Sequence, residues 1–181
     1  VFFLIYSFFR CFILSVNFFD FSSLFGYYLL RNRGIIGDEV MGVYDRLHQI
    51  LPGQPAKLFL LIGVNDVSHD LTADSIAGMI RMTVERIRKE SPDTRLYLQS
   101  LLPINESFGR YKRLAGKTNL IPEINKQLEA LAKEKGLTYI NLFPLFTEKG
   151  SNVLRADLTT DGLHLKEEGY KIWAKALRKK I

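Results

Sequence analysis

Cysteine is nearly missing from this chain, which has a single one, Cys11, among its 181 residues. One thiol cannot form an internal disulfide, and the three histidines show no spacing with Cys11 that is typical of a zinc site. The carboxylates show no calcium-loop spacing either. The sequence therefore predicts no metal and no cofactor, and it leaves the cellular compartment open.

A strong excess of one charge is also absent. The formal net charge is +6, but basic residues are interspersed with acidic ones and cluster only near the end, between Lys171 and Lys180. This pattern is typical of a solvated helix face rather than of a nucleic-acid-binding surface. With 24% charged and 47% hydrophobic residues, the composition is that of an ordinary soluble domain. We therefore expect one hydrophobic core and no nucleic-acid partner.

The first thirty residues contain almost no charge. Arg10 and Asp20 are their only charged side chains, and nine of the thirteen phenylalanines of the chain lie among them. This break in composition divides the sequence into two parts. We predict an atypical aromatic-rich N-terminal segment over 1–30 and the main domain over 31–181.

Three interpretations of the aromatic segment remain open. Residues 1–19 are almost long enough for a membrane anchor, but Arg10 and several polar side chains interrupt the apolar run, so membrane contact is not the favoured interpretation. A signal peptide would begin with basic residues and end at small ones, and neither is present. The third interpretation is a degraded first strand of a sheet, for which 9–14 is the best range.

Helical and strand patterns alternate along the rest of the chain. Apolar residues recur at helical spacing in four segments, and three short apolar runs between them are typical of strands. In chain order we predict a helix over 38–51, a strand over 57–64, a helix over 72–90, a strand over 95–102, a helix through Ile121–Leu131 that ends at Gly136, a strand over 138–142 and a helix over 166–179. This alternation predicts an α/β fold with a parallel sheet between helices.

Two short motifs carry most of the chemistry. Gly63-Val64-Asn65-Asp66 directly follows an apolar strand, where ligands bind in open α/β sheets. Asp161-Gly162-Leu163-His164 precedes the last predicted helix, and its spacing lets an acid and an imidazole face one cleft. Taken alone, the first motif is often only a turn, and the second is often a helix cap beside a surface histidine.

In combination the motifs resemble a known family, the SGNH (GDSL-type) hydrolases. A third block of that family, 32–38, reads Asn-Arg-Gly-Ile-Ile-Gly-Asp, and the three blocks occur in the family's order. The resemblance covers about Arg31 to the end of the chain. It implies esterase or acylhydrolase activity on a flavodoxin-like, three-layer α/β/α fold with no cofactor.

The resemblance also implies a role for each matching residue. His164 would be the general base that takes the proton of a serine hydroxyl, and Asp161 would hold the imidazole in the correct tautomer. Gly37 would offer its backbone N–H and Asn65 its side-chain amide to the oxyanion of the tetrahedral intermediate. The implied substrate is a small acyl ester, such as an O-acetylated carbohydrate or a lipid ester, cleaved by a Ser-His-Asp mechanism.

The serine block of the family, Gly-Asp-Ser or Gly-Asn-Ser, is missing. Ser15 lies nearest the expected distance from Gly37 and is the predicted nucleophile, whereas Ser7 fits that spacing less well. One explanation is that the residues before about Asp20 are not the family's native N-terminus. The alternative function is a catalytically inactive scaffold of this family that binds a carbohydrate or acyl ligand.

Overall fold

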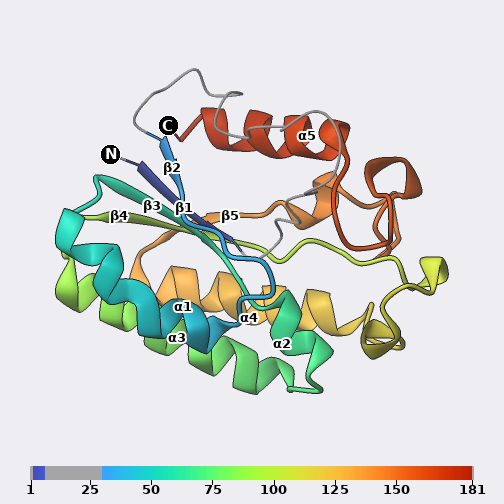
Figure 1. Cartoon of the computed structure of the whole chain (residues 1–181), viewed down its shortest axis with the longest axis horizontal. Coiled ribbons are helices and arrows are strands. Elements are labelled where there is room, and N and C mark those ends of the chain that lie inside the picture. The colour runs from blue at the N-terminus through green and yellow to red at the C-terminus, as the bar shows by residue number, and fades with distance from the viewer. Residues whose placement is uncertain (1, 7–29, 181) are drawn as a thin grey trace.

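A five-stranded parallel sheet forms the centre of the protein (Figure 1). The computed structural model describes residues 2–6 and 30–180. The strand order is β2-β1-β3-β4-β5, which is the flavodoxin-like order. The strands are β1 (Phe2–Tyr6), β2 (Leu30–Asn32), β3 (Lys57–Leu61), β4 (Arg95–Gln99) and β5 (Thr138–Ile140).

Helices cover both faces of the sheet and make a three-layer α/β/α arrangement. Figure 1 shows α1, α3 and α4 on one face and α5 on the other. The helices are α1 (Val40–Arg46), α2 (Val64–Ser68), α3 (Ala73–Glu90), α4 (Leu120–Lys135) and α5 (Glu167–Arg178). The predicted fold class is therefore confirmed. Because helices lie on both faces, β3 is apolar throughout its buried length, from Leu58 to Leu61.

The ends of the long helices follow the predicted capping signals. The Thr72 hydroxyl accepts a hydrogen bond from the Ser75 amide at the start of α3, and Gly136 adopts a left-handed φ of 64° after α4. On α5, Trp173 is fully buried, and its indole N–H donates to the Gln99 side chain of β4 over 2.7 Å. This bond between two buried polar groups fixes α5 against the sheet.

Several predicted boundaries are wrong by a few residues. Gly63, with a φ of 128°, ends the strand after β3, so Val64 begins helix α2 rather than ending a strand. Likewise, α1 begins at Val40 and not at Asp38, whose carboxylate instead accepts two hydrogen bonds from Arg46. Short 3₁₀ turns replace the end of that predicted helix, and β4 and β5 are shorter than expected.

The first strand lies closer to the start of the chain than expected. β1 covers Phe2–Tyr6 and occupies the position between β2 and β3, with Tyr6 opposite Leu61 of β3. The range 9–14, for which a first strand was predicted, lies outside the described residues. Within the described part of the chain, the helices are all too short or too polar to cross a membrane.

Asp66 connects two elements that surround the carboxyl edge of the sheet. Its side chain on α2 is 1% exposed, and both carboxyl oxygens accept hydrogen bonds from the Val40 amide of α1, over 3.3 and 3.2 Å. Burial raises the pKa of Asp66 from 3.8 to about 6, although the Val40 amide acts in the opposite direction. The folded protein therefore binds this proton more tightly than the unfolded chain does.

We predict that Asp66 makes stability depend on pH. The stability due to its proton is fully present below about pH 4 and is lost as the pH rises through about 6, a change of roughly 3 kcal/mol. Asp66→Asn keeps an acceptor for Val40 without the titration. Urea unfolding gives the free energy of unfolding of both proteins at pH 4 and at pH 7. From pH 4 to pH 7 this free energy should fall more for the wild type than for the variant. Equal pH dependence in the two proteins would contradict the prediction.

Candidate active site

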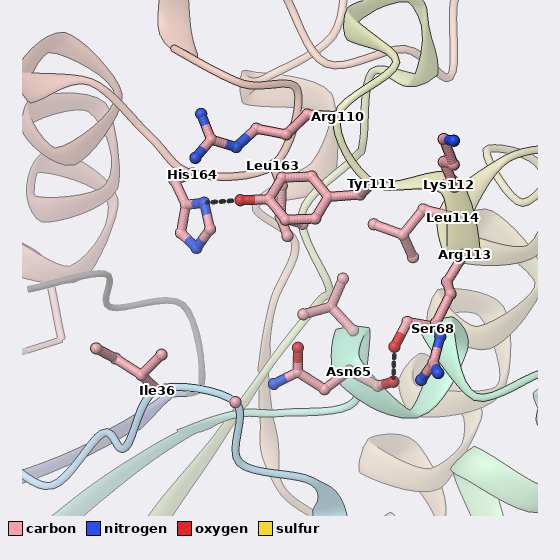
Figure 2. A pocket seen from close by; sticks show the side chains of 12 residues that line it. Ile36, Asn65, Ser68, Arg110, Tyr111, Lys112, Arg113, Leu114, Leu163 and His164 are labelled. Carbon is pink, nitrogen blue, oxygen red and sulfur yellow. Dashed lines mark hydrogen bonds between the residues drawn. The ribbon is translucent and has the colours of Figure 1, made fainter.

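The predicted site residues converge on one cavity at the carboxyl edge of the sheet. Gly37, Asn65 and His164 all line a cavity of about 700 Å³, although they are far apart in the sequence (Figure 2). Gly37 comes from the loop between β2 and α1, and Asn65 from α2 directly after β3. His164 precedes α5. Parallel strands end at the same edge, and this explains why the loops that follow them meet there.

Asp161 and His164 form a hydrogen-bonded pair. Oδ2 of Asp161 lies 2.8 Å from Nδ1 of His164, and Oδ1 accepts from the backbone amides of Leu163 and His164 over 3.1 and 2.8 Å. Asp161 is 5% exposed, whereas the imidazole is partly exposed toward the cavity. A carboxylate on Nδ1 leaves Nε2 as the nitrogen that faces the cavity (Figure 2).

The charge state of Asp161 is set by opposing effects. Burial acts to raise the pKa of Asp161, but the hydrogen bonds from the His164 amide and imidazole and from the Leu163 amide outweigh it. The net result is a pKa below the usual value of 3.8. Asp161 is therefore an anion at neutral pH, as a partner that stabilises an imidazolium must be.

The turn that carries this pair is held from two sides. The Thr159 hydroxyl donates to the carbonyl of His164 over 2.7 Å and accepts from the Gly162 amide over 3.0 Å. Gly162 has a φ of 86°, and its carbonyl accepts from the Asn105 amide over 2.7 Å. A side chain at this position would collide with the Asn105 carbonyl, so the backbone approach requires glycine.

Asn65 and Gly37 line the same cavity as the imidazole. One hydrogen of the Asn65 amide goes to the Asp38 carbonyl over 2.8 Å, and the second hydrogen of that nitrogen remains for a ligand. Gly37 has a φ of 75°, and no atom lies within 4 Å of the position where a side chain would begin. Its backbone is therefore open to close approach. This geometry suits donors to a developing oxyanion.

Tyr111 belongs to the site, and the sequence analysis missed it. Its hydroxyl donates to Oδ2 of Asp161 over 2.9 Å and lies 3.1 Å from Nδ1 of His164 (Figure 2). Tyr111 comes from the long loop between β4 and α4, and no motif surrounds it. Only its place in a loop at the carboxyl edge of the sheet gave a signal. Of the other predicted residues, Ser15 lies outside the described part of the chain.

Metal ligands do not gather in the part of the chain that the structure describes. No group of three or more His, Cys, Asp or Glu side chains there has a geometry that could hold an ion. The arrangement instead brings a carboxylate–imidazole pair, a side-chain amide and an open glycine backbone to one cavity. Groups of these kinds can transfer a proton and stabilise negative charge.

Comparison with known proteins identifies the family. The model of the GDSL-like lipase/acylhydrolase family matches residues 20–172, so the chain belongs to that family. Membership implies the hydrolysis of small ester substrates. The resemblance found in the sequence is thereby confirmed. A comparison of the sequence with curated proteins found no match.

Solved structures of the same fold are numerous. A Streptococcus pneumoniae protein linked by its name to platelet activating factor shares 27% identity with a TM-score of 0.84, over 99% of this chain and 82% of that one. A GDSL-like lipase from Bacteroides thetaiotaomicron shares 21% identity with a TM-score of 0.82, over 99% and 85%. An acetyl xylan esterase shares 22% identity with a TM-score of 0.70, over 84% and 80%. The last two likenesses show the fold alone.

We predict that Tyr111 tunes the Asp161–His164 pair. Tyr111→Phe removes a donor to Asp161, which leaves more negative charge on the carboxylate to stabilise the imidazolium. The acid limb of the pH profile of kcat/KM should therefore move to higher pH, by up to about one unit. Tyr139→Phe is the matched control, because its hydroxyl donates to the Asn125 carbonyl away from the cavity. A shift of equal size in both variants would refute the role of Tyr111.

Proposed function

We propose that the protein is a serine esterase that cleaves a small acyl ester by a Ser-His-Asp mechanism. The observation that carries the proposal is the meeting of the Asp161–His164 pair with Asn65 and Gly37 at one cavity. An O-acetylated carbohydrate or a short-chain lipid ester fits a site of this size. The first of these substrates is suggested by the acetyl xylan esterase, which shares this fold.

The geometry supports a two-step acyl transfer. Nε2 of His164 takes the proton of the serine hydroxyl as the oxygen attacks the ester carbonyl, and Asp161 stabilises the imidazolium that forms. Asn65 and Gly37 donate hydrogen bonds to the oxyanion of the tetrahedral intermediate. His164 then returns the proton to the leaving alcohol. In the second step the same base activates water, which releases the acid and restores the serine.

Two serines are candidates for the nucleophile. Ser15 is the prediction from the distance to Gly37, and it stays a prediction. The position of β1 adds Ser7, which follows Tyr6 directly in the sequence, and the serine block of the family stands at the end of the first strand. Neither serine has the glycine and acidic or amide residue that precede it in the family motif. This absence is the observation that favours the runner-up, a non-hydrolytic binding scaffold.

We predict that hydrolysis of p-nitrophenyl acetate depends on His164 and on one of the two serines. His164→Ala and the correct serine-to-alanine variant should each lower kcat by more than about 1,000-fold, because the nucleophile and its base act as a unit. The other serine-to-alanine variant then serves as the control. If the wild type is no faster than His164→Ala, the protein is a binding scaffold, and the esterase proposal is wrong.

We further predict that Asn65 acts on the transition state. Asn65→Ala should lower kcat by about 100- to 1,000-fold with little change in KM, since the donor is aimed at charge that develops only during the reaction. Asn152→Ala is the control, because that amide donates to the side chain of Asn119 outside the cavity. A rise in KM alone, with kcat unchanged, would assign Asn65 to substrate binding instead.

A further inference from the structure

The rim of the cavity carries three cationic side chains. Arg110, Lys112 and Arg113 lie in the loop between β4 and α4 and line the same cavity as His164. Figure 2 shows Arg110 extended toward the imidazole and Arg113 extended toward Ser68 of α2. All three side chains are exposed. A ligand bound beside His164 therefore lies in a cavity that also contains three cationic groups.

Carboxylates do not neutralise this rim within residues 2–6 and 30–180. No Asp or Glu of the described chain lines the cavity or forms an ion pair with these three cations. Acids do lie nearby, because Arg110 lines a second, smaller pocket with Glu106 and Asp161. Lys117 lowers the pKa of Asp70 most, and the charge of Arg113 lowers it further. These carboxylates have direct partners of their own. Asp70 pairs with Lys117 over 2.5 Å, and Glu106 accepts from the backbone amides of Gly116 and Thr118 over 2.6 and 2.7 Å. Among the described residues, therefore, no carboxylate forms an ion pair with a cation of the rim.

The loop that carries the cations is fixed to the site and is not a loose surface segment. Tyr111 binds the Asp161–His164 pair, and Leu114 is buried against the core. Lys117 donates to the Val67 carbonyl of α2 over 2.8 Å. The loop backbone that carries Arg110 and Arg113 is thereby fixed beside the cavity, because Tyr111 lies between them in the sequence.

The floor of the cavity has the opposite character. Val64, Leu114 and Leu163 are buried apolar residues that line it, and the exposed side chain of Ile36 closes one side. An apolar floor under a cationic rim suits an amphiphilic ligand, with a hydrocarbon part inside and an anionic group at the mouth. Arginine binds carboxylate and phosphate through paired N–H groups, which gives both attraction and orientation.

We propose that the esters cleaved at this site carry an anionic oxygen group, a carboxylate or a phosphate, that Arg110 and Arg113 bind at the rim. The inference rests on the proposed esterase function and specifies its substrate class. The anion holds the ester with its carbonyl between His164 and Asn65. Lys112 adds long-range attraction, which salt screens.

Matched ester pairs test this inference. On the acyl side, mono-4-nitrophenyl succinate and 4-nitrophenyl butyrate share a leaving group and differ mainly by a carboxylate. On the alcohol side, 4-acetoxybenzoate and its methyl ester differ in the same way. We expect the wild type to prefer the anionic member of at least one pair by roughly 10- to 100-fold in kcat/KM. The preference should shrink as the salt concentration rises.

Substitutions at the rim make the test specific. Arg110→Gln and Arg113→Gln should each remove much of the preference, because kcat/KM falls much more for the anionic ester than for its neutral partner. The double variant Arg110→Gln/Arg113→Gln should remove the preference altogether. Arg95→Gln is the control, because Arg95 begins β4 at the opposite edge of the sheet. Inhibition of butyrate ester hydrolysis by succinate or by inorganic phosphate, weakened in the Arg110→Gln variant, shows which anion the rim favours.

The outcomes separate this inference from the esterase proposal. Hydrolysis of neutral and anionic esters at equal kcat/KM, or a preference that survives in the double variant, overturns the anion site and leaves the esterase standing. If no ester is hydrolysed, the esterase proposal fails. Calorimetric titration of succinate and of inorganic phosphate into the wild type and the double variant then decides: binding that depends on the arginines supports the anion site, and no binding overturns it.

Discussion

The shared direction of the five strands is the constraint on which the site depends. Because every strand is parallel to its neighbours, all carboxyl ends lie at one edge, and each loop that leaves this edge starts within reach of the others. The imidazole, the amide and the glycine that line the cavity come from segments around residues 164, 65 and 37. An antiparallel sheet from the same segments would have sent half of these loops to the opposite edge.

Much of the fold could be predicted from the sequence because its signals are local. The apolar runs that become β3 and β4, the helical spacing of α3 and α4, and the caps at Thr72 and Gly136 depend on nearby residues alone. The boundaries after strands were harder. Gly63 ends β3 earlier than the apolar run suggests, since a backbone conformation and not hydrophobicity decides the matter.

The site was predictable only where motifs marked it. Asp161 and His164 are three residues apart on one turn, so their spacing was enough to predict that the two side chains meet. Tyr111 reaches the same carboxylate from fifty residues away in the chain, and such a contact depends on tertiary packing that no local pattern records. The nucleophile was obscured for another reason: the motif that would mark it is absent, and a serine without its neighbours is not distinctive.

The Asp66 link has a consequence for Gly37 and Asn65, the two residues proposed to bind the oxyanion. Gly37 precedes α1 and Asn65 lies on α2, and the bond from Val40 to Asp66 is a direct tie between those helices. Ionisation of a buried carboxyl weakens the fold as a whole but strengthens the hydrogen bond that this carboxyl accepts. Above about pH 6, therefore, the protein exchanges global stability for a stronger link between the two segments that carry Gly37 and Asn65.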